Sequence, residues 1–582
     1  MALRTVWRPQ RDEVVAVHGA VATKDPLATE VGLEVLKQGG NAVDAAVAVG
    51  FCLCVVEPMM TCIAGVGYML IALPGRGEEV VIDYGPRAPM RARPDMYRVL
   101  GEAPALIGLY QVEGRANEVG YLSIGVPGTV AGLCLAHRLY GSLPLPFLLE
   151  PAIHYAEQGF EVNWYLALCI SNAMSDFQVS PAACAVFLPR GRPPISSPKP
   201  AERLVQRDLA EVLKAIARHG SDAFYKGDIA DAIEQDMRAH GGLMTRADLE
   251  RYEAVVRAPL RVAWREVEVL APWGANGAIT ALETLNILEN FDLRALGHNT
   301  IDYLHTYAEA AGHAFADRYA YLGDPEAVAV PMRGLLSKEY ARHISQTLRP
   351  DRTVLPLPPG QVPWAYYDSR PLHDPWAYEG HPRPATAPVP SAHGGGDCTT
   401  HFCIVDRERN LVSCTQTAVS LFGSKVVTPG TGILWNNAML WFNPKPGTAN
   451  SVAPWKRPLV NMTPLLVKHG GRPVMAIGAP GGRRIIDCNT QVFLNMVAFG
   501  MGPQEAVAQP RVDVSSGEVL LDSRLGEEVA QGLRQRGHRV VVAEETPADV
   551  NFATPLAIQV DVQNNLVRAG VDVFRRAEAM GY

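Results

Sequence analysis

The chain has 582 residues, of which 48% are hydrophobic and 19% charged, and its formal net charge is -7 at pH 7. This composition can form a large core and excludes a disordered chain, and the acidic excess excludes the basic surface typical of nucleic-acid-binding proteins. Length alone predicts about four domains of roughly 150 residues each.

The pattern of the first half of the chain predicts one strand followed mainly by helices. Apolar and small residues alternate over 13–24, which predicts an early strand. Asn41 is suited to cap a helix that continues through the apolar run 42–56. That run is too short to span a bilayer and predicts a buried helix. The segments 130–260 and 278–322 are mainly helical in pattern.

The N-terminal sequence and the cysteines indicate which cellular compartment the protein occupies. The first residues are positively charged but lack the apolar core of a signal peptide. The ten cysteines form no CxxC pair and no Cys/His zinc spacing. We therefore expect reduced, buried thiols in a cytoplasmic protein, with no metal ion and no other cofactor.

A Pro- and Gly-rich stretch over about 349–397 interrupts the regular pattern. A long irregular segment inside a compact protein is functional, disordered or a linker. Four side chains within it could be imagined as metal ligands, but their spacing matches no known ligand pattern, so we do not assign a metal site: His373, Asp374, His381 and His393.

After this stretch the pattern predicts a β-hairpin. Residues 400–406 and 411–417 are strand-like, and the polar run 407–410 separates them. A hairpin symmetric about Glu408 places Thr399 opposite Thr417, where side chains lie roughly 5 Å apart.

Thr399 is the candidate nucleophile. A Thr hydroxyl is a weak nucleophile alone, but a free α-amine on the same residue, with a pKa of about 7.7–8.0, can act as its base. Such an amine exists only at a chain N-terminus, so the precursor must be cut between Cys398 and Thr399. Cys398 would then end the first fragment without a free amine, and we reject it as the nucleophile.

A glycine-rich turn supplies a candidate oxyanion site. Gly481 and Gly482 lie in the segment GAPGGRRII at 478–486, where adjacent glycines let backbone N–H groups approach a developing oxyanion. A phosphate-binding loop is the competing interpretation, but neither GxGxxG nor GxxxxGK[ST] is present.

These features together resemble the γ-glutamyltranspeptidase family over nearly the whole chain, from about residue 14. The motifs of its small subunit are matched by GDCTTHF at 396–402, GILWNN at 432–437, KRPL at 456–459, MTP at 462–464 and GAPGG at 478–482. The motifs of its large subunit are matched by GGNAVDAA at 39–46, GVPGTVAG at 125–132, EPAI at 150–153 and FADR at 315–318.

The resemblance implies an α+β fold, the four-layer αββα sandwich of N-terminal-nucleophile hydrolases. One composite domain would form from a large subunit (1–398, with 349–398 as the linker before the cut) and a small catalytic subunit (399–582) that stay associated. Carried over to this sequence, Thr399 is the nucleophile and its α-amine the base, Thr417 supports its hydroxyl, and Gly481 and Gly482 form the oxyanion hole.

The family's residues for glutamate recognition are mostly replaced. Gly85 stands where the family has an arginine for the donor α-carboxylate, and the nearest arginine is Arg87. Val419 replaces an amino-group-binding Asn, and Ala438 and Trp441 replace a Gln/Glu and an Asp that hold the ammonium.

Further positions around these belong to the same predicted pocket. The family's Ser-Ser pair is Val460-Asn461 here, and Arg483 stands where Ser is usual. Arg87 or Arg483 could hold a substrate carboxylate. Asn436 and Asn437 either orient the site or only satisfy backbone groups. The candidate substrate-binding residues are Arg87, Val419, Asn436, Asn437, Ala438, Trp441, Asn461 and Arg483.

An ammonium buried without a carboxylate partner costs several kcal/mol, so a zwitterionic γ-glutamyl donor should bind poorly. We expect a self-processing amidohydrolase that acts on a non-γ-glutamyl amide of small size, similar to the cephalosporin-acylase-like and oxamate-amidohydrolase-like branches of the family.

Two alternatives stay open: a true γ-glutamyltransferase or glutathione hydrolase with altered donor recognition, and an inactive binding or scaffold relative. Neither nucleic acid nor membrane is an expected partner, and the sequence leaves open a dimer of heterodimers.

Overall fold

The computed structural model describes residues 9–101, 110–354, 374–379 and 397–582 of the uncut chain. Two seven-stranded, fully antiparallel sheets form its centre. In order across sheet 1, the strands are β1 (Val14–Ala16), β22 (Leu566–Val571), β21 (Leu556–Asp561), β17 (Arg472–Gly478), β16 (Leu465–His469), β11 (Val267–Ala271) and β10 (Leu260–Trp264). In order across sheet 2, they are β23 (Glu578–Gly581), β2 (Ala20–Thr23), β12 (Asp397–Val405), β13 (Leu411–Ser420), β3 (Val66–Leu73), β4 (Glu78–Tyr84) and β9 (Val255–Arg257).

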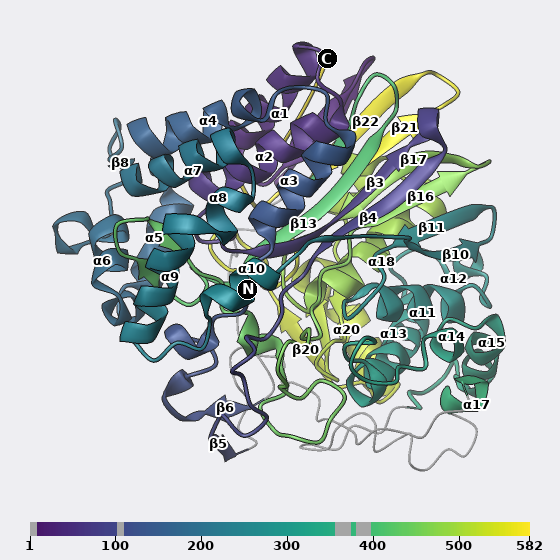
Figure 1. Ribbon diagram of the computed structural model, residues 1–582. Coiled ribbons are helices and arrows are strands. Elements are labelled where there is room, and N and C mark those ends of the chain that lie inside the picture. The colour runs from purple at the N-terminus through teal and green to yellow at the C-terminus, as the bar shows by residue number, and fades with distance from the viewer. Residues whose placement is uncertain (1–8, 102–109, 355–373, 380–396) are drawn as a thin grey trace.

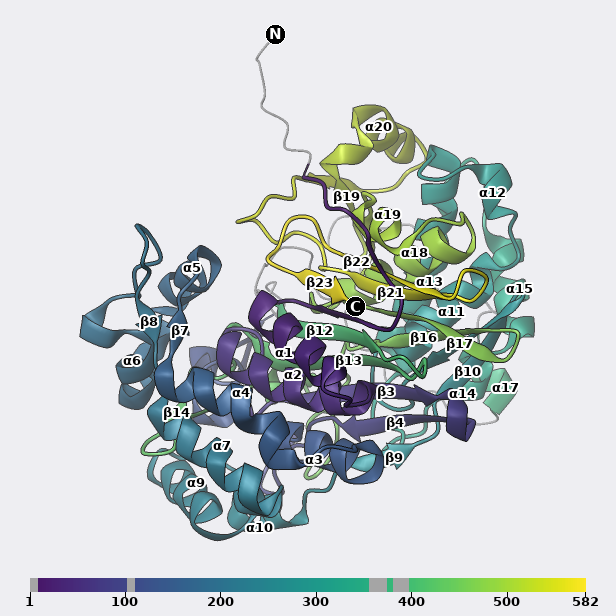
Figure 2. The ribbon, with the colours of Figure 1, turned by 90° about the horizontal axis from the view of Figure 1, so that it is seen from above.

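The sheets lie face to face between two layers of helices, which confirms the predicted αββα sandwich (Figures 1 and 2). The helices on the side of sheet 2 are α1 (Pro26–Lys37), α2 (Ala42–Val56), α3 (Thr129–Tyr140), α4 (Leu145–Gln158) and α7 (Arg207–His219). The helices on the side of sheet 1 are α11 (Ala278–Leu288), α13 (Ile301–Tyr321), α15 (Lys338–Thr347), α18 (Arg484–Val497), α19 (Pro503–Ala508) and α20 (Glu527–Gln535). Buried apolar side chains fill all three interfaces between layers.

Smaller elements complete the chain. The remaining helices are α5 (Trp164–Ala173), α6 (Pro181–Phe187), α8 (Asp222–Tyr225), α9 (Gly227–Ala239), α10 (Arg246–Arg251), α12 (Leu293–Leu296), α14 (Met332–Leu335) and α17 (Trp376–Glu379). The remaining strands are β5 (Val99–Gly101), β6 (Gln111–Val112), β7 (Phe160–Glu161), β8 (Arg203–Leu204), β14 (Val427–Thr428), β15 (Ile433–Leu434), β18 (Val512–Asp513), β19 (Val519–Asp522) and β20 (Val540–Ala543).

The early strand predicted over 13–24 is two strands. β1 pairs with β22 in sheet 1, and β2 pairs with β12 and β23 in sheet 2, so the chain crosses between sheets within a few residues. Gly19 permits the crossing, because a Cβ at this position would lie 2.6 Å from the carbonyl oxygen of Val405. The alternation in the sequence is the same for one long strand as for two short ones, and only tertiary pairing separates them.

The buried helix predicted from residue 42 is confirmed as α2. Asn41 accepts hydrogen bonds from the backbone N–H groups of Val43 and Asp44, and the Asp44 carboxylate accepts from the Asn41 N–H in return. This capping box satisfies helix-end donors that would otherwise be buried without partners. Every residue of α2 is buried between the neighbouring helices and sheet 2.

The expectations for the helical segments and for the cysteines agree with the structure. Helices dominate 130–260, and α11, α12 and α13 occupy 278–322. Most of the stretch over 349–397, with His373, His381 and His393, lies outside the described residues. All ten cysteines are free thiols, and nine of them are buried. None of the described helices has both the length and the apolar character that crossing a membrane requires.

The hairpin is formed by β12 and β13 in the predicted register up to the candidate nucleophile. Thr400 pairs with Gln416 and Val405 with Leu411, which is symmetric about Glu408. The ladder then shifts, because Cys398 pairs with Val419, so that Thr399 alone faces two residues of β13. Such a bulge re-aims a side chain, and here it lies at the end of the hairpin beside a cavity.

Candidate active site

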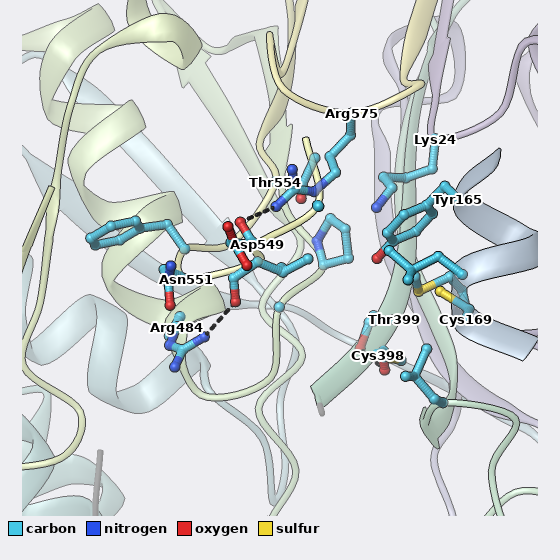
Figure 3. Close-up of a pocket in the computed structure, with 18 of the residues that line it drawn as sticks. Lys24, Tyr165, Cys169, Cys398, Thr399, Arg484, Asp549, Asn551, Thr554 and Arg575 are labelled. Atoms are coloured by element: carbon cyan, nitrogen blue, oxygen red, sulfur yellow. Dashed lines mark hydrogen bonds between the residues drawn. The ribbon is translucent and has the colours of Figure 1, made fainter. Parts of the chain in front are cut away.

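A cavity of about 300 Å³ opens beside the start of β12, and Thr399 lines it together with Cys398 and Gly481 (Figure 3). Its other lining residues lie on α5, at the start of α18, in the loop before β21, and in the segments that follow β2, α2, β13, β17 and β22: Lys24, Met60, Tyr165, Leu168, Cys169, Asn172, Leu421, Pro480, Arg484, Ala548, Asp549, Val550, Asn551, Phe552, Thr554 and Arg575. The structure thus brings the predicted nucleophile and one of the two predicted oxyanion glycines into one space, which is the arrangement that acyl transfer requires.

The hydroxyl of Thr399 lies against the peptide bond that precedes it. Thr399 Oγ1 is 2.5 Å from the carbonyl oxygen of Cys398 and 3.3 Å from Thr417 Oγ1. Thr417 Oγ1 in turn lies 2.6 Å from the same carbonyl oxygen. Both hydroxyls therefore contact the carbonyl of the predicted cleavage site, and Thr399 is only 3% exposed.

The backbone of Val419 holds the Thr417 hydroxyl in place. Val419 N donates to Thr417 Oγ1 at 2.7 Å, so the Thr417 proton is left to donate to Cys398. Val419 has φ of +91°, a conformation that is a genuine outlier for a β-branched residue. Strain of this kind is on the order of 1–3 kcal/mol and collects at functional sites.

The glycine pair lies in the turn between β17 and α18. Gly481 has φ of +140°, and a Cβ there would lie 2.6 Å from the Cα of Ala553. Gly482 has φ of +61° and follows it directly, but it is not among the cavity-lining residues. Because α18 begins at Arg484, the positive end of its helix dipole lies near the cavity.

Three predicted substrate-binding residues form one apolar cluster. Val419, Ala438 and Leu440 are buried together, and the partly buried Trp441 packs against them. The cluster adjoins the predicted nucleophile Thr399 indirectly, because Val419 N donates to Thr417 Oγ1 and Thr399 Oγ1 lies 3.3 Å from the same atom. None of the four residues of the cluster is among those that line the cavity around Thr399.

Asn436 and Asn437 are fully engaged by the protein itself. Asn436 Nδ2 donates to the carbonyls of Ala64 and Gly125, and its Oδ1 accepts from two backbone N–H groups. Asn437 Nδ2 donates to the Glu118 carbonyl and to Ser420 Oγ. Both side chains are completely buried, so in this structure they brace the loops around the site.

Asn461 and Arg483 lie apart from the cavity. Asn461 Oδ1 accepts a hydrogen bond from the buried guanidinium of Arg318 at 2.8 Å, and Arg318 also donates to the Val460 carbonyl. Burial lowers the pKa of Arg318 to about 10, with a further lowering from the nearby charge of Arg483. Neither Asn461 nor Arg483 is among the residues that line the cavity around Thr399.

The side chain of Arg87 also lies outside the cavity around Thr399 and contacts other residues. Its Nη2 forms an ion pair with Glu326 Oε2 at 2.8 Å, and its Nη1 donates to the Trp455 carbonyl at 2.9 Å. The guanidinium lies over the Trp455 ring. The structure thus gives the Arg87 charge a protein partner and does not place the side chain in the cavity.

Sequence reasoning did not find the charged and polar side chains that do line the cavity. Lys24 and Tyr165 lie on one wall, and Asp549, Asn551 and Arg484 lie on the opposite wall (Figure 3). Arg575 donates to Glu545 Oε1 at 2.5 Å and to the Asp549 carbonyl. These residues come from segments far apart in the chain, and of them only Arg484 lies in a segment with a sequence signal, GAPGGRRII at 478–486. The signal at Lys24 is weaker, a lysine directly after the buried strand β2.

Two buried groups near the hairpin have shifted pKa values. Burial raises the pKa of Glu57, at the end of α2, to about 7, against the opposing charge of Lys24, and its carboxylate accepts from Thr400 Oγ1 at 2.7 Å. Burial lowers the pKa of Lys24, and the charge of Glu57 partly offsets this. The predicted nucleophile Thr399 therefore has the poorly solvated Glu57 carboxyl beside its neighbour Thr400 and the poorly solvated Lys24 side chain in the same cavity.

One cluster among the described residues has the composition of a metal site but lies apart from the cavity. His305, Glu309 and His538 bring their ligand atoms within 4.8 Å of one another. Internal hydrogen bonds already engage them: His305 Nδ1 lies 2.7 Å from His538 Nε2, and Glu309 accepts from Val354 N. We therefore assign no metal to the site chemistry.

Comparison with known proteins agrees with this geometry. The sequence model of the family described as "Gamma-glutamyltranspeptidase" matches residues 28–582. The chain is 38% identical over 538 residues to the acylase ACY 1 proenzyme of Pseudomonas sp. (strain V22), covering 92% of this chain and 89% of the relative. It is 35% identical over 555 residues to the glutathione hydrolase proenzyme of Escherichia coli (strain K12), covering 93% and 88%.

Solved structures show the same relationship. The crystal structure of cephalosporin acylase from Bacillus halodurans superposes with a TM-score of 0.84 at 27% identity, covering 100% of this chain and 99% of that one. Helicobacter pylori γ-glutamyltranspeptidase superposes with a TM-score of 0.53 at 33% identity, covering 60% of this chain and 95% of that chain. The family match, the fold and the two relatives lead to one conclusion: this chain belongs to the γ-glutamyltranspeptidase family.

Proposed function

We propose that the chain is a self-processing threonine amidohydrolase, an acylase that cuts itself between Cys398 and Thr399 and then hydrolyses small amides through an ester on Thr399. The observation that carries the proposal is the contact of two hydroxyls, Thr399 and Thr417, with the Cys398 carbonyl inside a cavity. Relatives over nearly the full length are proenzymes of acylases and glutathione hydrolases, which supports processing of a precursor.

Self-cleavage would proceed as an N-to-O acyl shift. Thr399 Oγ1 attacks the carbonyl carbon of Cys398, the C–N bond breaks, and the departing nitrogen takes up a proton to become the α-amine of Thr399. Thr417 donates a hydrogen bond to the carbonyl oxygen and stabilises the negative charge that develops there. Water then hydrolyses the ester, which leaves a carboxylate on Cys398 and a free hydroxyl on Thr399.

The cut would leave two subunits that cannot separate easily, 1–398 and 399–582. Sheet 1 contains β1, β10 and β11 from the first and β16, β17, β21 and β22 from the second. In sheet 2, β12 lies between β2 of the large subunit and β13 of the small one. Because both sheets depend on strands from both pieces, the processed enzyme should remain one composite domain.

Turnover would use the amine that the cut creates. The α-amine of Thr399 accepts the hydroxyl proton while Oγ1 attacks the substrate carbonyl, and the proton then goes to the departing amine. The backbone N–H groups of the Gly481–Gly482 turn would stabilise the tetrahedral oxyanion. The same amine then activates water to hydrolyse the acyl ester, which releases the acid and restores the enzyme.

The surroundings of the site favour an acyl group without an α-ammonium. Val419, Ala438 and Trp441 form an apolar cluster that does not line the cavity but adjoins Thr417 through Val419 N. Asp549 is the one carboxylate among the described cavity-lining residues, and it is exposed and accepts from Thr546 Oγ1 at 2.8 Å. A buried ammonium would lack a partner, which costs several kcal/mol.

Glutathione hydrolysis is the second candidate, because several full-length relatives carry that name. A γ-glutamyl p-nitroanilide, assayed with and without a dipeptide acceptor beside a panel of simple acyl p-nitroanilides, separates the two. The proposal predicts turnover of simple acyl anilides and little acceptor-stimulated turnover of the γ-glutamyl compound. Robust, acceptor-stimulated γ-glutamyl transfer would contradict it, and no turnover of any amide by processed protein would favour an inactive relative.

A further inference from the structure

Two histidines and a glutamate converge apart from the cavity around Thr399, between α13 and the turn that joins α20 to β20. His305 and Glu309 are four residues apart on α13, so their side chains project from the same face of the helix. His538 reaches them from the turn, because α13 packs against α20 (Figure 1). Each of the three side chains offers one ligand atom, and these atoms lie within 4.8 Å of one another.

The cluster lies in the interior of the protein. Glu309 is 0% exposed, His305 1% and His538 9%. A buried carboxylate needs hydrogen bonds and nearby positive charge to offset the hydration that it loses. A divalent cation at the centre of the cluster would supply such charge, whereas neutral imidazoles supply only lone pairs. The environment thus favours a cation at this point.

Hydrogen bonds from outside the cluster orient its ligand atoms. His305 Nε2 lies 2.6 Å from the carbonyl oxygen of Arg349. A carbonyl oxygen only accepts, so Nε2 carries the proton, and in a neutral imidazole this leaves the Nδ1 lone pair facing the cluster. The Glu309 carboxylate accepts from the hydroxyl of Thr353 and from the N–H of Val354. Histidines and carboxylates that bind metals are oriented by outer hydrogen bonds of these kinds.

The distances within the cluster lie on either side of those in a zinc site. His305 Nδ1 lies 2.7 Å from His538 Nε2, which in turn lies 4.0 Å from Glu309 Oε1. Ligand atoms at about 2.0–2.1 Å from a tetrahedral zinc ion are roughly 3.3–3.4 Å apart. Small side-chain rotations that separate the imidazoles and bring the carboxylate closer would form the site. Only the hydrogen bond between the two histidines is given up, because the outer contacts involve other partners.

One positive charge lies near the cluster and has a partner of its own. The guanidinium of Arg536 acts electrostatically on both imidazoles. It forms an ion pair with Asp302, in the first turn of α13, and donates to the Ile301 carbonyl at 3.3 Å. Because a carboxylate offsets this charge, Arg536 does not exclude a cation from the cluster.

We propose that His305, Glu309 and His538 bind a zinc ion. Two imidazole nitrogens and one carboxylate oxygen are donors that Zn²⁺ accepts, and a water molecule would complete the tetrahedral geometry. The harder cations Ca²⁺ and Mg²⁺ favour oxygen ligands instead. The spacing of cysteines and histidines in the sequence does not reveal the site, because the two histidines are 233 residues apart.

The zinc ion would also connect the two subunits. Two of its ligands belong to the large subunit, and His538 belongs to the small one. The contacts that orient the other two ligands come from 349–354, where the Pro- and Gly-rich stretch begins, and Thr353 N donates to the Arg536 carbonyl at 2.6 Å. The ion would thus hold this segment against the small subunit. Zinc binding is independent of the proposed function, and only the connection between subunits rests on the proposed cut.

The binding test uses the full chain, freed of metal by dialysis against EDTA and then against metal-free buffer. Calorimetry with Zn²⁺ should show one ion bound per chain, and His538→Gln should weaken binding by about 100-fold or more. Glutamine can still donate a hydrogen bond to His305, so the melting temperature of the metal-free variant should stay close to that of wild type. Saturating Zn²⁺ should raise the melting temperature of wild type and leave that of His538→Gln unchanged.

A matched control is His469→Gln, because His469 is exposed at the end of β16. This variant should bind Zn²⁺ as wild type does. Co²⁺ gives a measurement that needs no variant: in a tetrahedral site of wild type its visible absorption should intensify, and Zn²⁺ should displace it. Zn²⁺ binding that is unchanged in His538→Gln, or Co²⁺ that keeps the spectrum of the hydrated ion, would overturn the site.

Subunit separation in urea tests the connection. For processed wild type, EDTA should lower the urea concentration at which the two subunits separate in size-exclusion chromatography. His538→Gln should separate at that lower concentration with or without EDTA. An EDTA effect of equal size in both proteins would refute the connection. A chain that is never cut would refute the proposed function, whereas one Zn²⁺ bound per uncut chain would still support the site.

Discussion

Thr417 Oγ1 lies 2.6 Å from the carbonyl oxygen of Cys398, on the peptide bond that precedes Thr399. If this hydroxyl stabilises the oxyanion of self-cleavage, Thr417→Val should slow processing of the precursor by about 100-fold or more. Thr417→Ser keeps the hydroxyl and should process at a rate within about 10-fold of wild type. The time course of precursor disappearance on denaturing gels measures both, and equal rates for Val and Ser would argue against this role.

The apolar cluster of Val419, Ala438 and Trp441 predicts a penalty for the donor ammonium. Glutaryl p-nitroanilide is γ-glutamyl p-nitroanilide without its α-ammonium, so the pair isolates that group. We expect kcat/KM for the glutaryl compound to exceed that for the γ-glutamyl compound by about 100-fold. A γ-glutamyl compound that reacts equally well would show that another group of the site binds the ammonium.

Gly481 should tolerate no side chain. Its φ of +140° disfavours any L-residue, and a Cβ would lie 2.6 Å from the Cα of Ala553. Gly481→Ala should lower activity by about 100-fold or more through loss of the turn geometry. Gly500→Ala is the control, since Gly500 has φ of +76° and a Cβ there would meet no atom within 4 Å. It should cost about 1 kcal/mol of stability and leave kcat unchanged. Equal activity of both variants would exclude Gly481 from the oxyanion site.

Glu57 predicts a pH dependence of stability. Burial raises its folded-state pKa from 4.5 to about 7, so the folded chain binds more protons than the unfolded chain between these values. Stability should therefore fall as pH rises from about 4.5 to about 7 and stay lower above it. Glu57→Gln, which keeps an acceptor for Thr400, should gain roughly 3 kcal/mol over wild type at pH 8 and nothing near pH 4. Thermal unfolding across this range measures the gain, and a difference independent of pH would refute the shift.

The hairpin shows which features of the fold the sequence pattern predicts and which it does not. Alternation and the polar run 407–410 predicted its strands and its symmetry about Glu408, because local pairing fixes register. The bulge at Thr399 and the positive φ at Val419 depend on loops from elsewhere, such as the one that brings the Met60 carbonyl to Ala418 N. Strained geometry of this kind leaves no periodic signal in the chain.

The charges of the site were harder still to predict. Arg87 was a reasonable carboxylate anchor from its place in a motif, but Glu326 is more than two hundred residues away in sequence and pairs with it. Lys24 carries no motif, and its burial in the cavity follows from the pairing of β2 with β12 and the packing of α5. Whether a cation has an ion-pair partner depends on tertiary packing, which composition and residue spacing do not reveal.

In the proposed function, Thr399 cuts the chain before it catalyses. Intact mass measurement of the purified protein, with N-terminal sequencing, tests this order of events. We expect two chains from the 582 residues, corresponding to 1–398 and 399–582, with the smaller beginning at Thr399, and a single uncut chain for Thr399→Ala. Active wild-type protein that remains one uncut chain, or is cut at another bond, would contradict the proposed function.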